Sequence, residues 1–266
     1  MKTEKPLVTG IRNFAKNCGF TKAHLGLSGG IDSALVAYLA VQALGAENIT
    51  CINMPSRYSS QGSKDDAAQL ANNLGCRYES LPIENCYAAF LSTLEGLFKS
   101  RPFDTTEENL QSRIRGTLLM AFANKFHSML LCSSNKSEIT MGYITLYGDT
   151  SGALAPIGDI YKTDVFSLCR LINERSQKKT GKLIIPQVII DKPPSAELRP
   201  NQKDEDSLPP YDILDGILKA YNKKLTAGQI AALGYDIKLV ESIINTIKRS
   251  EFKLRQLPPM IRRRHK

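Results

Sequence analysis

Two glycines and an aspartate stand where an apolar strand would give way to a helix. The run HLGLSGGIDSALVAYLA, residues 24–40, passes through Ser28, Gly29 and Gly30 and reaches Asp32 at the expected helix start. A glycine-rich turn in this position offers backbone N–H groups to an anion, and glycine allows close approach and positive φ. The run matches neither GxxxxGK[ST] nor GxGxxG, so neither of those nucleotide-binding loops is present. The stretch therefore predicts an anion-binding loop of another kind.

Asp32 extends this prediction to a metal ion. A carboxylate in the first turn of a helix is favoured by the helix dipole by about 0.3–1 kcal/mol, so helix capping alone is one explanation for Asp32. Beside a polyphosphate, however, a carboxylate repels the ligand unless a divalent cation lies between them. Mg²⁺ is bound by carboxylate and phosphate oxygens together. We therefore interpret the glycines as polyphosphate-binding and Asp32 as magnesium-binding, with Ser28 and Ser33 as hydroxyl donors.

Residues 28–33, SGGIDS, resemble the SGGxDS signature of the N-type ATP pyrophosphatases, the PP-loop superfamily. Members of that superfamily split ATP between its α- and β-phosphates, adenylate an oxygen, release pyrophosphate and let a nitrogen or sulfur nucleophile displace AMP. The motif is shared by GMP synthetases, asparagine synthetases and tRNA-modifying enzymes. A second stretch, SSNKSEITMGYITLYGDTSGALAPIGDIYKT (133–163), and the later KPPSAEL are similar to NAD synthetases, and together the matches span most of residues 24–215.

The resemblance to NAD synthetases implies a set of site residues. The implied catalytic residues are Asp32, Lys162 and Glu138, with Asp32 and Glu138 binding Mg²⁺. The implied ligands of deamido-NAD are Arg113, His265 and Lys266. ATP contacts carried over by the resemblance are Gly26, Leu27, Ser28, Gly29, Gly30, Ile31, Asp32, Ser33, Ser133, Lys162 and Ser195.

Each assignment has a simpler alternative. Glu138 could be a helix-surface carboxylate with a local partner, and Ser195 a turn residue beside prolines. Arg113 and Arg115 could both be solvated, and two positions apart on a helix they point in different directions. The HK pair at 265–266 could be an unstructured part of the basic tail.

The resemblance also implies a reaction: amidation of deamido-NAD (nicotinate adenine dinucleotide) to NAD by ammonia, with ATP and Mg²⁺, through an acyl-adenylate. It further implies a homodimer with the dinucleotide site near its interface. Three alternatives stay open: amidation of nicotinate mononucleotide, a PP-loop tRNA-modifying enzyme, and a non-catalytic nucleotide-binding module. The tRNA alternative is weakened because no reactive cysteine pair is present.

Two positions depart from the family pattern. Ammonia-dependent enzymes commonly carry lysine where Leu146 stands and aspartate where Ala153 stands, so we transfer no substrate contact to either residue. This neighbourhood is more similar to the synthetase domain of glutamine-dependent enzymes. Only 23 residues precede His24, however, so we expect this chain to lack their amidase domain. Either free ammonia or a separate ammonia-supplying subunit would then provide the nitrogen.

Composition is consistent with a nucleotide enzyme. With 42% hydrophobic and 23% charged residues among 266, the chain has the make-up of a globular protein. No apolar run approaches 18 residues, and the opening MKTEKPLVTG lacks the core of a signal peptide, so we expect a cytoplasmic protein that does not contact membranes. The net charge of +9 suits an anionic ligand. No basic stripe is interleaved with aromatics, which argues against nucleic acid as a partner.

Cysteine usage agrees with a cytoplasmic compartment. The cysteines are spaced at least ten residues apart and form no CxxC pair, and none of the three histidines neighbours a cysteine pair, so a zinc site is not expected. We therefore expect reduced, buried thiols at Cys18, Cys51, Cys76, Cys86, Cys132 and Cys169.

The elements that must position these residues alternate between strands and helices. Such alternation predicts an α/β fold, a doubly wound parallel sheet with helices on both faces; by resemblance it is Rossmann-like, of the adenine nucleotide alpha hydrolase type. The expected strands are 22–27, 49–55, 76–82 and 128–134, and the expected helices before residue 150 are 5–18, 31–44, 63–74, 84–97 and 105–126.

After residue 150 we expect a long loop, a helix at 163–175 and an apolar run, LIIPQVII. The proline-rich stretch 192–212 reads as a mobile surface loop and a candidate lid, with segment 82–87 as a second candidate. Helices at 212–222 and 236–249 precede the basic tail. We expect one domain over 1–266, with its nucleotide-binding core at about 20–175 and a C-terminal helical extension from 212.

Overall fold

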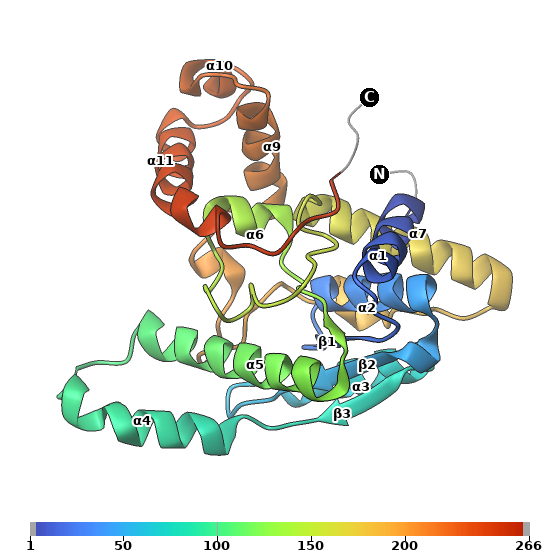
Figure 1. Cartoon of the computed structure of the whole chain (residues 1–266). Helices are drawn as coiled ribbons and strands as arrows, with labels where there is room; N and C mark the ends of the chain where they lie inside the picture. Colours follow the sequence, from blue (N-terminus) through green and yellow to red (C-terminus); the bar gives the residue numbers. More distant parts are fainter. Residues whose placement is uncertain (1–3, 100, 263–266) are drawn as a thin grey trace.

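The computed structural model describes residues 4–99 and 101–262, and in them a parallel sheet lies between layers of helices (Figure 1). The sheet has the order β3-β2-β1-β4, with every neighbouring pair parallel. Its strands are Ala23–Gly26 (β1), Ile49–Asn53 (β2), Arg77–Ser80 (β3) and Met129–Leu130 (β4). All four expected strands are present, and the predicted α/β class is confirmed.

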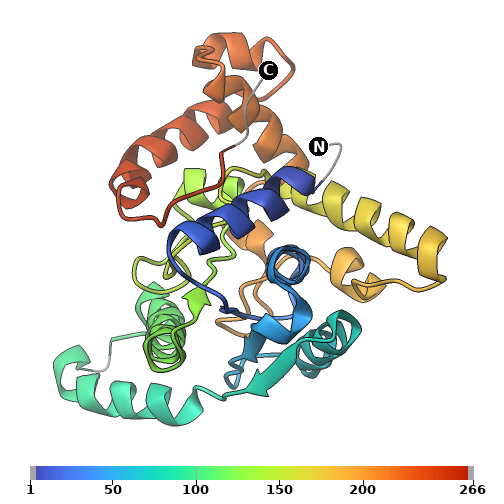
Figure 2. The same cartoon turned by 45° about the vertical axis from the view of Figure 1, so that its right-hand side comes forward.

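Helices cover both faces of the sheet. Helix α2 (Ile31–Leu44) packs on one face together with α3 (Gln61–Leu74), and α1 (Lys5–Asn17) and α7 (Lys162–Thr180) pack against α2 from outside. Helix α5 (Thr105–Phe126) covers the other face, with α4 (Glu84–Phe98) beside it (Figures 1 and 2). Helix α2 lies between the sheet and the outer helices, and residues 33–40 of it are all buried. This explains why its apolar residues are too dense for an amphipathic stripe.

The structure differs from the predicted secondary structure at several short helices and at one strand. Three α-helices were not predicted: α6 (Lys136–Met141), α8 (Gln187–Asp191) and α10 (Ala227–Ala231). Each has five or six residues, too few to show a helical period in the sequence. The strand predicted at 128–134 is limited to β4, with one further bridge from Leu131 to Leu154, because the chain then turns toward α6.

The C-terminal helices form a second apolar core. Helices α9 (Tyr211–Asn222), α10 and α11 (Ile237–Leu254) pack with α6, and the centre of this core includes Leu214, Ile217 and Val240. Lys253 of α11 fastens this unit to the chain after α6, because its Nζ donates to the carbonyls of Gly142 (2.7 Å) and Ile144 (2.8 Å). The predicted helical extension is therefore built onto the part of the chain that carries Glu138.

The cysteine prediction is partly wrong. Cys51, Cys132 and Cys169 are buried free thiols, but Cys18 and Cys86 are exposed. Cys18 follows the end of α1, and Cys86 lies on the outer side of α4, so neither faces an apolar layer. Among the described residues, no helix has the length and apolar character needed to cross a membrane.

His24 of β1 gives the fold a pH dependence. Its Nε2 lies 3.0 Å from the Leu119 carbonyl and therefore carries the proton, which leaves Nδ1 to accept from the Ser128 hydroxyl at 2.9 Å. Burial lowers the pKa of His24 from 6.5 to about 4. Below pH 6.5 the unfolded chain binds a proton that the folded chain excludes, so stability is complete above that pH and is lost as pH falls toward 4.

We therefore expect acidification from pH 7.5 to 5 to remove about 2 kcal/mol of unfolding free energy through His24 alone. Urea unfolding at both pH values measures the loss, and His24→Gln should show a correspondingly smaller one. The control is His127→Asn. His127 is exposed, and its backbone is in the left-handed conformation (φ 48°), which asparagine tolerates. An equal pH response in wild type and His24→Gln would contradict the prediction.

Candidate active site

A cavity of about 310 Å³ opens at the carboxyl ends of β1, β2 and β4. In this sheet the order reverses at β1, because β2 and β3 lie on one side of it and β4 on the other. Crevices at such switch points are where open α/β sheets bind ligands. Eleven of the residues implied by the resemblance line the cavity: Gly26, Leu27, Ser28, Gly30, Ile31, Asp32, Ser33, Ser133, Glu138, Lys162 and Ser195.

The glycine loop is shaped by close contact with α3. Gly29 has φ +80°, and a Cβ there would lie 2.2 Å from the Ser63 carbonyl oxygen, so only glycine fits. Gly30 begins α2 without any side-chain cap. Ser33 Oγ donates to the Gly30 carbonyl at 3.0 Å and lies 3.2 Å from Ser28 Oγ. The loop thus holds its own shape while the N-terminal N–H groups of α2 remain at the cavity.

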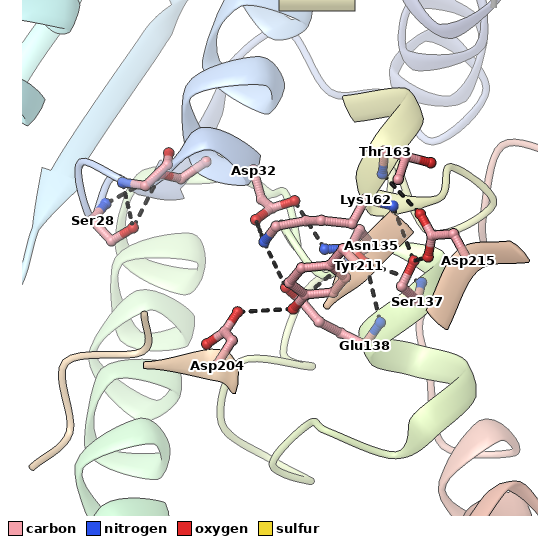
Figure 3. A network of polar contacts seen from close by, with 12 residues as sticks. Ser28, Asp32, Asn135, Ser137, Glu138, Lys162, Thr163, Asp204, Tyr211 and Asp215 are labelled. Carbon is pink, nitrogen blue, oxygen red and sulfur yellow. Dashed lines mark hydrogen bonds and ion pairs between the residues drawn. The ribbon is translucent and has the colours of Figure 1, made fainter. Parts of the chain in front are cut away.

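Three implied catalytic residues meet at one point (Figure 3). Lys162 Nζ lies 2.5 Å from Asp32 Oδ2 and 3.1 Å from Glu138 Oε1. Asn135 Nδ2 donates to the other Asp32 oxygen at 2.9 Å. The Lys162 side chain is 3% exposed, against 18% for Asp32 and 17% for Glu138. Asp32 is therefore more than a helix-end carboxylate, because it joins α2 to α6 and α7.

Local sequence explains how Glu138 reaches this point. Helix α6 begins with a reciprocal capping box in which Asn135 Oδ1 accepts from Glu138 N at 3.1 Å and Glu138 Oε2 accepts from Asn135 N at 3.3 Å. The second Glu138 oxygen remains for Lys162. The alternative of a surface glutamate with a local partner is therefore incomplete, since Glu138 makes its local contact and also faces the cavity.

Asp215 holds this arrangement from behind. This α9 carboxylate is 1% exposed, accepting from Ser137 Oγ (2.5 Å) and from Thr163 N (2.8 Å), while Ser137 Oγ accepts from Lys162 N (2.9 Å). The starts of α6 and α7 are thus tied to the C-terminal helices. Asp215 was missed by the sequence reading. The signal that could have found it is an acidic residue on the apolar face of α9, between Leu214 and Ile217.

The cluster carries more negative than positive charge. Asp204 also lines the cavity, with one of its oxygens accepting from Tyr211 OH at 2.8 Å, so three carboxylates act on Lys162. Burial alone would lower the pKa of Lys162, but the carboxylates of Asp32, Glu138 and Asp204 outweigh burial and raise it above its usual range. Burial, followed by the nearby Asp32 and Asp204, raises the pKa of Glu138. The site therefore favours an additional cation.

The donor set suits Mg²⁺ that is shared with a polyphosphate. The described residues contain no group of three or more metal-ligating side chains, so protein atoms alone do not complete a metal site. Mg²⁺ is commonly held by one or two carboxylates together with phosphate oxygens and water. Asp32 and Glu138 offer two such carboxylates at the cavity, both facing one ammonium group.

The two arginines of α5 have different surroundings, and the implied role of Arg113 in binding deamido-NAD stays a prediction. Arg113, implied for deamido-NAD, is exposed, donates to the Leu146 carbonyl at 3.3 Å and is not among the residues that line the cavity. Arg115 points another way, as expected, but into the cavity. His265 and Lys266 lie outside the described residues. Ala153 packs against the main core.

The loop after α8 lies over the cavity and is fastened to α3. Ser195 lines the cavity, but its hydroxyl donates to the Gln202 carbonyl at 2.6 Å. Glu197 was missed by the sequence reading, and its carboxylate accepts from the hydroxyls of Ser60 and Ser63, both at 2.8 Å. Segment 82–87, the second candidate lid, contains the start of α4 and contributes no lining residue.

A parallel α/β sheet with a glycine loop and an Asp–Lys–Glu cluster at its switch point defines a nucleotide-binding protein of the doubly wound class. Comparison with known proteins then narrows the class. The NAD synthase family model matches residues 4–258. The chain belongs to the NAD synthase family, and the resemblance read from the sequence is confirmed.

The relatives differ in the nitrogen source and the product that their names give. The glutamine-dependent NAD(+) synthetase of Synechocystis is 52% identical over 95% of this chain and 44% of its own length. An NMN synthetase structure from Francisella tularensis is 28% identical, with a TM-score of 0.77 over 94% of both chains. An NH3-dependent NAD synthetase from Campylobacter jejuni is also 28% identical, with a TM-score of 0.74 over 94% of this chain and 93% of its own. The chain spans less than half the length of the curated relatives it matches.

Proposed function

We propose that this chain amidates deamido-NAD to NAD with ammonia, using ATP and releasing AMP and pyrophosphate. The observation that carries the proposal is Lys162, held between Asp32 and Glu138 beside a glycine loop, in a member of the NAD synthase family. The cluster combines a cation for phosphate oxygens with carboxylates for a metal. A module that only binds nucleotide has no need of this combination.

In the first step the nicotinate carboxylate attacks the α-phosphorus of ATP. The bond from this phosphorus to the oxygen that bridges to the β-phosphate breaks, pyrophosphate leaves and an acyl-adenylate forms. Lys162 supplies positive charge to the phosphates, and the N–H groups at the start of α2 bind phosphate oxygens. When bound between Asp32, Glu138 and ATP, Mg²⁺ would neutralise charge on the phosphates and the leaving pyrophosphate.

In the second step neutral ammonia attacks the acyl carbon, loses a proton and displaces AMP to leave the amide. No protein nucleophile is required. Water must be kept out because it would hydrolyse the acyl-adenylate. We propose that the loop over residues 192–210 does this, since it lines the cavity and Glu197 anchors it to α3.

Product analysis tests the proposal. Purified protein is incubated with Mg-ATP, ammonium and deamido-NAD, and we expect NAD, AMP and pyrophosphate in equal amounts. Replacing ammonium by glutamine tests the nitrogen source, and adding a separate amidase subunit tests for an ammonia-supplying partner. Formation of ADP, or of no nucleotide product, would contradict the proposed adenylation.

Nicotinate mononucleotide is the second candidate substrate. The observation that favours it is the likeness to the Francisella NMN synthetase, which covers 94% of both chains. Competition between nicotinate mononucleotide and deamido-NAD in one reaction distinguishes the two candidate substrates. Our proposal requires NAD to form faster than nicotinamide mononucleotide. The match to the NAD synthase family over residues 4–258 argues against the tRNA-modifying alternative.

We propose that the protein is a homodimer formed through α4 and α5. Helix α4 is apolar yet buries only Tyr87, and Phe90 (50% exposed) and Leu97 (73%) lie on it. Met120 and Phe126 are exposed apolar residues of α5, which packs beside α4. Patches of this kind mark association sites on soluble proteins, and a second copy is the occupant that the family resemblance implies.

We expect Leu97→Lys to convert the dimer into a monomer of 29.4 kDa, because a charge in an apolar interface must be desolvated. Light scattering coupled to size-exclusion chromatography measures the mass. The control is Leu233→Lys, at another exposed leucine (61%) beside α10. A Leu97→Lys protein that kept the wild-type mass would place the interface elsewhere.

A further inference from the structure

Arg115 is a cation in the cavity with no role in the mechanism above. It lies on α5, lines the cavity and donates from Nε to the carbonyl of Met54 at 2.9 Å. Met54 directly follows β2, and its side chain approaches Gly26 at the end of β1. The guanidinium is thereby anchored where the first two strands end, beside the glycine loop.

Arg115 differs from Lys162 and Lys192, two other partly or fully buried cations of the cavity. A third, the partly buried Lys64, contacts Gln61 Oε1 at 3.5 Å. Lys162 is paired with Asp32 and Glu138, and Lys192 with Asp66 at 2.8 Å. Within residues 4–99 and 101–262, no carboxylate lies within ion-pair distance of Arg115. The acid whose charge acts on it is Glu197, and the Glu197 carboxylate is already engaged by Ser60 and Ser63.

Arg115 is partly buried. Partial withdrawal of a guanidinium from water without a counterion costs free energy, and a ligand that supplies the anion recovers that cost. Burial lowers the pKa of Arg115 to about 10, which still leaves it charged at neutral pH. With Nε used by Met54, the two terminal nitrogens keep their N–H groups for an anion, in the fork geometry that suits phosphate oxygens. The cavity wall around it is apolar, with Ile52, Met54 and Leu119, and so suits a nucleoside beside that phosphate.

We propose that Arg115 binds the α-phosphate of the nucleotide, the phosphate that stays on AMP. This assignment rests on the proposed use of ATP. It separates two tasks in the cavity: the Asp32–Lys162–Glu138 cluster serves the metal and the departing pyrophosphate, and Arg115 holds the group that is transferred. Arg115 would then keep the acyl-adenylate in place while ammonia attacks.

Binding of AMP and of adenosine, without other substrates, tests the assignment. Isothermal titration should show that Arg115→Gln binds AMP about 10–100-fold more weakly than wild type, because a charge-assisted hydrogen bond is lost, whereas adenosine affinity stays unchanged. Arg115→Lys keeps the charge but lacks the fork geometry of the guanidinium. Its AMP affinity should therefore lie between those of wild type and Arg115→Gln. The matched control is Arg249→Gln, an exposed arginine on α11, with wild-type affinity for both ligands.

Unchanged AMP affinity in Arg115→Gln would overturn the assignment, as would an equal loss for AMP and adenosine. Melting temperatures establish that each variant is folded, and if Arg115→Gln is not folded, Arg115→Lys provides the comparison. The result is independent of amidation. A protein that formed no NAD but lost AMP affinity in this way would refute the proposed substrate and leave the Arg115 assignment standing.

Discussion

Replacing Lys162 by methionine is expected to slow AMP formation about 10²–10³-fold, the range seen when one transition-state charge stabiliser is removed. Lys162 is nearly without exposure and contacts both Asp32 and Glu138. Methionine keeps most of the volume but leaves the two carboxylates facing each other and the phosphates without their cation. The measurement is the single-turnover rate of AMP release from ATP and deamido-NAD.

Lys136→Met is the matched control for this prediction. Lys136 lies at the start of α6, two residues from Glu138, and pairs with Asp159 at 2.6 Å with 17% of its side chain exposed. It does not line the cavity. A lysine–aspartate pair is lost in both variants. Equal slowing in the two would therefore show that Lys162 acts through stability. Lys162→Arg, which keeps the charge, should recover part of the rate.

Asp32→Asn is expected to slow the same reaction at least about 10²-fold and to raise the Mg²⁺ concentration needed for half-maximal rate. Asparagine has nearly the same shape and preserves an acceptor for Asn135, but it removes the charge that a divalent cation requires. The loss should be largest at low Mg²⁺ and smaller as Mg²⁺ is raised. Rates measured over a MgCl₂ series test this dependence directly.

The control is Asp212→Asn. Asp212 stands in the first turn of α9 as Asp32 stands in the first turn of α2, but it is exposed and outside the cavity lining. Both substitutions remove a favourable interaction with a helix dipole. If the Mg²⁺ dependence of Asp32→Asn matched that of Asp212→Asn, Asp32 would be a helix-end carboxylate without a metal role.

The alternation of elements and the glycine motif were readable from the sequence because both depend on local pattern. Continuous apolar strands, helices ended by Gly45 and Gly75, and the SGGIDS loop are short-range features, so the parallel sheet and its anion-binding loop followed from them. The grouping of Asp32, Glu138 and Lys162 was implied only by resemblance, since more than a hundred positions separate Asp32 from either partner.

The tertiary structure decided in which direction the site residues point and which partners they contact. Arg113 and Arg115 are indistinguishable by type and share a helix, yet the packing of α5 on the sheet turns Arg115 toward the cavity and leaves Arg113 exposed. Asp215 has no motif, and its contact with the starts of α6 and α7 exists because the C-terminal core docks there. Sequence period determines which elements form, whereas the direction and partners of a polar side chain depend on how distant elements pack.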